Sequence, residues 1–127
     1  MKPGIILFAH GSRIESANEA VRAVAAQLAE AGGFSNVSAA FLELGRPDLE
    51  TAAATLVAQG VTDLVVIPYF LTLGLHMDRD LPRLVEAISL HYKGVRIMVT
   101  PPLDGHPALV SILLDRAREA LPPNQHP

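Results

Sequence analysis

The sequence predicts an α/β domain in which helices cover both faces of a four-stranded parallel sheet. Short apolar runs alternate four times with longer segments whose apolar residues recur at helical spacing. Each run is apolar at nearly every position, which is typical of a strand that is buried on both faces. Repeated strand–helix units connect through right-handed crossovers, and this arrangement gives three layers.

The first half of the chain is expected to hold two strands and two helices. The strands are residues 5–9 and 36–44, which are rich in apolar side chains. Helical spacing extends over residues 16–33, where two glycines end the pattern because glycine adopts the left-handed conformation that closes helices. The second helix begins near Pro47 and stops at Gly60.

The second half repeats this alternation. Residues 64–67 form the third expected strand and residues 95–99 the fourth, which two prolines end. Between them, a loop over residues 68–77 leads to a helix for which Asp78 and Asp80 are the expected caps. The last helix carries an apolar stripe of Leu109, Ile112, Leu113 and Ala117.

Length and composition point to one folded domain. The 127 residues are 50% apolar and 18% charged, which excludes an intrinsically disordered chain. We expect residues 1–121 to form a single domain. Residues 122–127 are expected to fray, because this proline-rich end has no large apolar side chain to bury.

Composition also excludes several partners and sites. The net charge of −3 offers no basic field for a nucleic-acid backbone. Without cysteine there is no disulfide, thiolate metal site, iron–sulfur cluster or cysteine nucleophile, so histidines and carboxylates would have to bind any metal. No signal peptide or membrane-spanning apolar segment is recognisable, and we therefore expect a cytoplasmic protein that does not bind a membrane.

Candidate functional residues follow the strands, at the edge where ligands bind in open parallel sheets. His10 comes directly after the first strand, Glu43 lies at the end of the second, and His76 ends the loop after the third. The two histidines are candidate nitrogen ligands for a metal. Glu43 among apolar neighbours would be desolvated and useful as a base or ligand. The alternatives are an ordinary loop histidine at position 10 and a solvated edge carboxylate at position 43.

The loop after the third strand is unusual because residues 69–75 are almost wholly apolar, whereas connections are normally polar. Such a segment packs against a partner subunit, walls a pocket for a large apolar ligand, or does both. Gly11 and Ser12 offer backbone amides that suit a carboxylate or phosphate. Four arginines are expected near the same edge of the sheet. They lie either at solvated helix ends or at a site for a flat ligand rimmed with carboxylates, and they are Arg13, Arg46, Arg79 and Arg83.

Taken in order, these motifs resemble those of the small sirohydrochlorin chelatases of the CbiX/SirB type. The resemblance covers nearly the whole chain except its C-terminal tail, and the ordered set is more specific than any one motif. The matching segments are AHGSR at 9–13, FLE at 41–43, PYFL at 68–71 with Gly74 and His76, DLP at 80–82, PL at 102–103 and GHP at 105–107.

The resemblance implies a chelatase-like three-layer fold and an activity. Members insert a divalent metal into sirohydrochlorin in cobalamin or siroheme biosynthesis, and cobalt is the first metal expected, with ferrous iron and nickel as alternatives. The metal is then a substrate, and no organic cofactor is implied. Short members correspond to half of the larger two-lobed chelatases and are expected to pair as homodimers.

The resemblance also implies roles for individual residues. His10 and His76 match the positions that bind the incoming metal, and Glu43 matches a carboxylate that assists ligation or proton removal. The tetrapyrrole contacts expected on this basis are Gly11, Ser12, Arg13, Arg46, Phe70, Leu71, Thr72, Leu73, Gly74 and Leu75.

Three other functions fit parts of the pattern. A carrier of metal or tetrapyrrole would use the same histidines and apolar wall without turnover. A histidine phosphatase or mutase also has His-Gly after its first strand, but its motif resembles Arg-His-Gly, whereas Ala9 precedes His10 here. A doubly wound regulatory module would need clustered acids after the first and third strands, where this chain has histidines.

Overall fold

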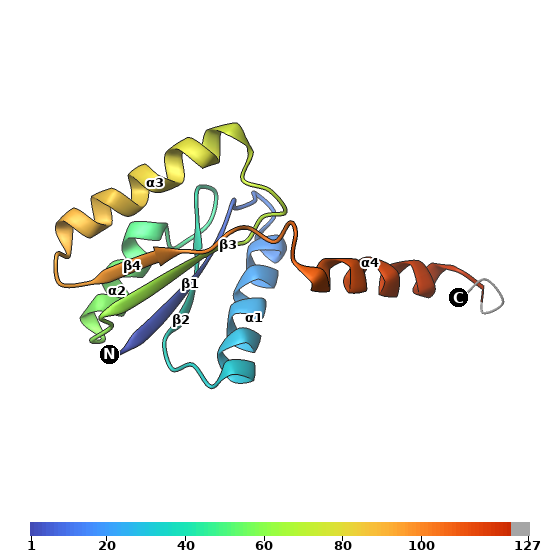
Figure 1. The fold of residues 1–127 in the computed structure, drawn as a ribbon, viewed down its shortest axis with the longest axis horizontal. Coiled ribbons are helices and arrows are strands. Elements are labelled where there is room, and N and C mark those ends of the chain that lie inside the picture. The colour runs from blue at the N-terminus through green and yellow to red at the C-terminus, as the bar shows by residue number, and fades with distance from the viewer. Residues whose placement is uncertain (123–127) are drawn as a thin grey trace.

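A computed structural model describes residues 1–122, and its strands form one parallel sheet (Figure 1). The order across the sheet is β2-β1-β3-β4, so β1 and β3 are the central strands. This arrangement confirms the predicted α/β fold class. The strands are β1 (Pro3–Ala9), β2 (Val37–Phe41), β3 (Asp63–Pro68) and β4 (Arg96–Val99).

Within residues 1–122, four helices follow the four strands in alternation, and the first three lie on the two faces of the sheet (Figure 1). Helix α1 packs on one face, and α2 and α3 pack on the other. The expected stop of the first helix is confirmed, because Gly33 adopts a left-handed conformation and its N–H closes the last turn. The helices are α1 (Glu15–Gly32), α2 (Leu49–Ala58), α3 (Gly74–His91) and α4 (Pro107–Ala120).

Alternating side chains of the central strands build two cores. Phe8 of β1 and Leu64 of β3 point towards α2 and α3, where Leu81 packs against them. On the opposite face, Leu7 and Phe41 pack with the residues of α1. The unbroken apolar runs in the sequence reflect this burial on both faces.

The connections reverse direction between β1 and β3. From β1 the chain passes over one face through α1 to β2, and then over the other face through α2 to β3. In doubly wound sheets the loops diverge at such a switch point and leave a crevice beyond the carboxyl ends of the two strands. The segments at this point are His10–Arg13 after β1 and Tyr69–Leu73 after β3.

Two element boundaries differ from the prediction by three residues or more. Strand β2 ends at Phe41, three residues before the predicted end at Leu44. Leu44 itself has a left-handed φ of 57°, which lies outside the extended conformation of a strand. Helix α3 begins at Gly74, so the caps expected at Asp78 and Asp80 were wrong: both residues lie inside the helix. No side chain caps this helix start, and the usual sequence signal for a helix N-terminus is therefore missing.

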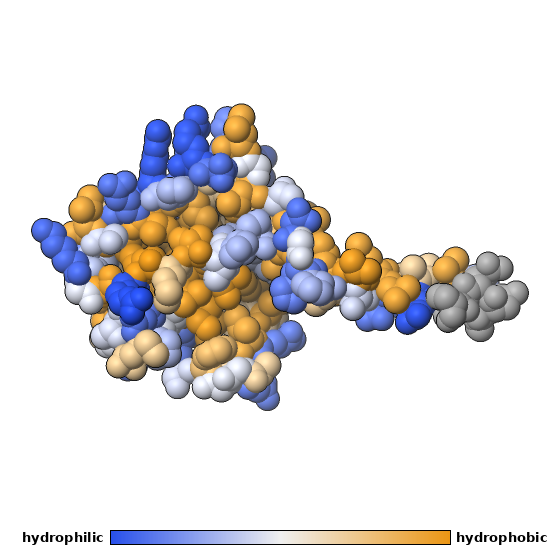
Figure 2. All heavy atoms as spheres, viewed as in Figure 1, coloured by the Kyte–Doolittle hydropathy of each residue, from blue (hydrophilic) through white to orange (hydrophobic). Residues whose placement is uncertain are grey.

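Helix α4 extends away from the rest of the molecule (Figure 1). None of its residues is fully buried, and most of the predicted apolar stripe is uncovered: Ile112 and Leu113 are 54% and 60% exposed, while Leu109 is half-buried. Figure 2 shows apolar side chains along this projecting helix and over the neighbouring face of the sheet. The fourth helix of the predicted fold is present, but it leaves its share of the sheet uncovered.

None of the helices within residues 1–122 is long and apolar enough to span a membrane. The predicted fraying of residues 122–127 concerns a segment that, apart from Pro122, lies outside the described residues.

Candidate functional site

The loops after β1 and β2 bring His10 and Glu43 together. The imidazole Nε2 of His10 lies 3.5 Å from a carboxylate oxygen of Glu43. Both side chains face solvent, with exposed fractions of 60% and 58%, so they are open to a ligand. The desolvation expected for Glu43 is not found, because β2 ends before this residue and the turn carries it out of the apolar layer.

Aromatic side chains connect His10 to the hydrophobic core. The ring of Phe70, which follows β3, lies edge-on to the imidazole with 6.3 Å between ring centroids. Phe70 in turn contacts the fully buried Phe8, at 6.2 Å between centroids. Two edge-to-face ring contacts therefore connect His10 to the apolar core at the switch point of the sheet.

His76 lies in the first turn of α3 and is exposed, rather than at the end of a loop as predicted. Its Nδ1 is 3.4 Å from a guanidinium nitrogen of Arg79, one turn further along the helix. Among the described residues, no group of three or more histidine and acidic side chains is close enough to hold a metal ion. The structure thus pairs His10 with Glu43 and leaves His76 on a separate element of the same edge.

The apolar segment after β3 divides into supporting and exposed residues. Phe70 and Leu73 pack against the core. Leu71 and Leu75 are 61% and 86% exposed, and Thr72 and Gly74 are exposed beside them. We call residues 70–75 the apolar rim. Its half-buried residues anchor it to the core, and its exposed residues face outward at the carboxyl edge of the sheet.

The predicted arginines lie on three different elements: the loop after β1, the loop after β2 and helix α3. Arg13 and Arg46 are exposed on the loops after β1 and β2. Arg79 pairs with Asp80 at 3.2 Å, and Arg83 lines a shallow hollow with Leu42. Of these side chains, Arg13 and Arg46 lie on the loops that carry His10 and Glu43.

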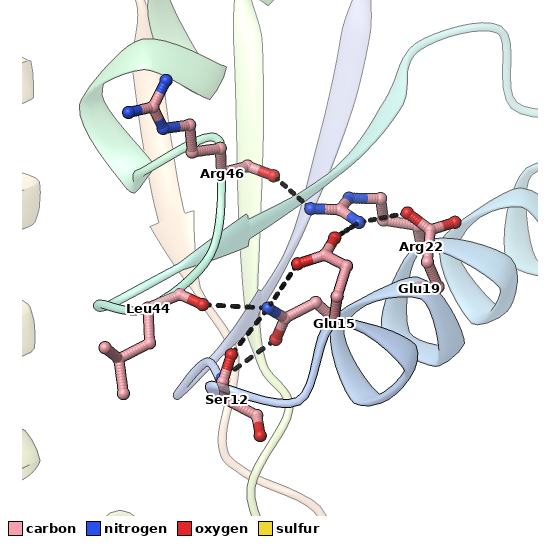
Figure 3. A network of polar contacts seen from close by, with 7 residues as sticks. Ser12, Glu15, Glu19, Arg22, Leu44 and Arg46 are labelled. Atoms are coloured by element: carbon pink, nitrogen blue, oxygen red, sulfur yellow. Dashed lines mark hydrogen bonds and ion pairs between the residues drawn. The ribbon is translucent and has the colours of Figure 1, made fainter.

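A polar network that the sequence analysis missed fixes these two loops (Figure 3). Its centre is Asn18 of α1, which is 1% exposed. Asn18 interrupts the apolar stripe that Val21 and Ala25 continue, and a polar residue on a buried helical face is the signal that could have revealed it. Arg22, one turn later, donates to the carbonyl of Arg46 at 2.8 Å.

The charges in this network stabilise one another. Hydrogen bonds from Arg22 and Asn18 lower the pKa of the Glu15 carboxyl, and the bond to Glu15 raises the pKa of Arg22. Arg22 also contacts Glu19 and lies over the ring of Phe41, 5.2 Å from its centroid. The guanidinium is therefore held in one position from α1, where it can bind the loop after β2.

Comparison with known proteins identifies the family. Residues 4–120 match the family described as CbiX. A sirohydrochlorin cobaltochelatase of Sulfurisphaera tokodaii is 32% identical over 118 residues, which cover 93% of this chain and 93% of the relative. The chloroplastic sirohydrochlorin ferrochelatase of Arabidopsis thaliana is also 32% identical over 118 residues, but this chain spans only 52% of its length.

Solved structures agree with this match. A CbiX protein of Marinobacter aquaeolei VT8 superposes with a TM-score of 0.81 and 32% identity, covering 92% of this chain and 95% of that one. The sirohydrochlorin chelatase SirB of Bacillus subtilis subspecies spizizenii, in complex with cobalt, gives 0.82 and 28% identity, covering 94% of this chain and 51% of that one. The resemblance drawn from the sequence motifs is thereby confirmed, and the chain belongs to the CbiX family.

Proposed function

We propose that this protein is a sirohydrochlorin chelatase that inserts a divalent metal into the tetrapyrrole. The observation that carries the proposal is the exposed His10–Glu43 pair at the switch point of the sheet, 3.5 Å apart. A nitrogen ligand beside a carboxylate, next to an apolar rim, suits a reaction between a metal ion and a flat macrocycle. The CbiX family match and the activities named for its relatives support the same conclusion.

In this proposal His10 and His76 bind the incoming metal, which is a substrate rather than a resident cofactor. Two imidazoles leave further coordination positions open, so the pyrrole nitrogens can replace the metal's other ligands. Insertion releases two pyrrole protons for each divalent ion. Glu43 is placed to accept one of them or to assist His10 as a ligand, because its carboxylate lies 3.5 Å from the imidazole and is exposed at the same edge.

The tetrapyrrole is proposed to lie against the apolar rim after β3. Phe70 and Leu73 hold this rim on the core, while Leu71 and Leu75 offer exposed apolar surface to the ring. Peripheral carboxylates of the ring would then reach the basic and backbone groups of the other loops. These groups are Arg13, Arg46, the amide of Gly11 and the hydroxyl of Ser12, because the Ser12 amide already donates to Asn18. Thr72 and Gly74 complete the rim.

Cobalt is the metal we propose first, with ferrous iron and nickel as alternatives. Imidazole and carboxylate ligands bind all three, and intrinsic affinity favours cobalt and nickel over ferrous iron. The relatives include both cobaltochelatases and a ferrochelatase. We place the reaction in the cytoplasm. The chain has no cysteine, and its stability therefore does not depend on a disulfide that would require an oxidising compartment.

A homodimer is the proposed working unit, with residues 1–121 acting as one domain in each copy. Helix α4 presents an exposed apolar face that includes Val110 and Leu113. On the α1 side of the sheet, Val65 and Ile67 of the central strand β3 are only half-buried, and Met98 of the edge strand β4 is exposed beside them. A helix and a strip of sheet that each lack cover are complementary, and packing α4 of one copy on the strip of the other would bury both.

The length of the relatives supports this pairing. SirB is about twice as long as this chain, which covers 51% of it. Two copies of the short chain would therefore supply what SirB holds in one chain. We propose that the apolar rims of the two copies face a shared cleft for the macrocycle.

Anaerobic insertion kinetics test the proposed activity. Sirohydrochlorin is mixed with cobalt, ferrous iron or nickel, with and without the protein, and product formation is followed by absorbance. We expect several turnovers per protein molecule at a rate well above that of spontaneous insertion, and fastest with cobalt. Binding of the metal and the tetrapyrrole without faster insertion would instead identify a carrier, and absence of both would refute the proposal.

A further inference from the structure

Asn18 of α1 is a buried polar side chain with every hydrogen-bonding group in use. Its Oδ1 accepts from the backbone N–H of Ser12 at 2.9 Å. Its Nδ2 donates to the carbonyls of Ser12 and Leu44, each at 2.9 Å, and lies 3.3 Å from a carboxylate oxygen of Glu15. One carboxamide thus joins the loop after β1 to the loop after β2 (Figure 3).

The two joined loops are those that carry His10 and Glu43. The N–H of Glu43 donates to the carbonyl of His10 at 3.1 Å, and the N–H of Leu42 donates to that of Ala9 at 2.9 Å. Gly11, with a φ of 96°, lies so close to the second loop that a Cβ on it would be 1.6 Å from the carbonyl oxygen of Glu43. Two backbone hydrogen bonds and a close approach therefore hold the backbones of the two loops together beside these side chains.

The second loop adopts a conformation that needs an external partner. Leu44 has a φ of 57°, which is unfavourable for a residue with a side chain, and this side chain is half-exposed, so its packing contributes little. The hydrogen bond from Asn18 to the Leu44 carbonyl is a direct restraint on that backbone. Arg22 adds a second restraint from the same helix through the carbonyl of Arg46.

We propose that Asn18 is a positioning residue for metal insertion, because it holds Glu43 beside His10 without itself touching a substrate. The inference rests on the proposed chelatase function. A ligand and a proton acceptor must be placed within a fraction of an ångström, and a shift of about 1 Å at such a pair can cost about 100-fold in rate. Loss of Asn18 would free the Leu44 turn and let the carboxylate drift from the imidazole.

The test uses Asn18→Ala and the isosteric Asn18→Asp, which keeps an acceptor for Ser12 but loses the donors to Ser12 and Leu44. Ala25→Gly is the matched control, since it weakens the buried face of the same helix without touching either loop. Initial rates of cobalt insertion are measured for all variants that are folded at the assay temperature by circular dichroism. Amide hydrogen exchange at Glu43 reports the contact between the loops independently of activity.

We expect the Asn18 variants to lose about 10-fold or more in kcat/KM and to exchange the Glu43 amide faster, while Ala25→Gly keeps both values near wild type. The loss should disappear in a Glu43→Ala background, because Asn18 then has no carboxylate to position. Equal losses in Asn18→Asp and Ala25→Gly, or an unchanged rate in the Asn18 variants, would overturn the proposal. An inactive wild type would instead refute the chelatase function on which it rests.

Discussion

The His10 imidazole and the Glu43 carboxylate are 33 positions apart in the sequence. They lie close together because each follows one of two neighbouring parallel strands, whose carboxyl ends meet at the same edge of the sheet. Residue types and strand ends predicted that both would lie at one edge of the sheet. Their 3.5 Å separation was not predictable, since the loop that carries Glu43 turns at a left-handed Leu44 whose carbonyl accepts from the buried Asn18. Neither feature has a sequence signal near Glu43.

The role of Glu43 is tested by the change Glu43→Gln, which keeps the shape of the side chain but removes its charge and basicity. We expect cobalt insertion to slow by about 100-fold, because general-base assistance is commonly of that size. Glu50→Gln, on an exposed position of α2, is the control and should be unaffected.

Calorimetric titration with cobalt separates the two ways in which Glu43 can act. A slower rate with unchanged cobalt affinity identifies a proton acceptor, and a weaker affinity identifies a ligand. A rate equal to wild type would remove Glu43 from the reaction.

Among the elements, the start of α2 was predicted well and the start of α3 was not. Helix α2 begins directly after Asp48, whose carboxylate accepts the N–H of Thr51 at 2.8 Å, close to the start predicted near Pro47. Helix α3 has no capping side chain, and its start was predicted four or more residues too late. His76 was therefore expected on a loop, although its place at the carboxyl edge does not change.

The cap of α2 gives a stability prediction with a defined pH dependence. The hydrogen bond from the Thr51 N–H lowers the pKa of Asp48, so its stabilising contribution is complete above the unfolded pKa of about 4 and is lost as pH falls through the lower folded value. Asp48→Ala should reduce the free energy of unfolding by about 1 kcal/mol at neutral pH. This difference should shrink in acid.

Urea unfolding at pH 7 and at pH 3 measures this difference. Glu30→Ala, an exposed change on α1, serves as the control at both pH values. A cost for Asp48→Ala that is the same or larger at pH 3 would contradict the capping role.

At the scale of the whole molecule, the sequence predicted four helices but not where the last one packs. The amphipathic pattern of α4 was read correctly, and its apolar face remains exposed in the single chain. Periodicity indicates that a helix has a face to bury, but it does not indicate whether the covering surface belongs to the same chain. The open strip of β3 and β4 is the surface that the proposed second copy would cover.

Two lysine substitutions on α4 test the dimer. Leu113→Lys places a charge on the apolar face, and Ser111→Lys places the same charge on the polar face two residues away. Light scattering after gel filtration should show a dimer for the wild type and for Ser111→Lys, and a monomer for Leu113→Lys. The wild type should also melt at a temperature that rises with protein concentration. A monomeric wild type, or a Leu113→Lys variant that remains dimeric, would contradict this assembly.

We propose that His10 and His76 together deliver the metal to the macrocycle. This role is tested by the anaerobic initial rate of cobalt insertion into sirohydrochlorin by the double variant His10→Ala/His76→Ala. His91→Ala, which removes an exposed imidazole at the far end of α3, is the control. We expect the double variant to insert cobalt only at the spontaneous rate and the control to match the wild type. Full activity in the double variant would contradict the claim.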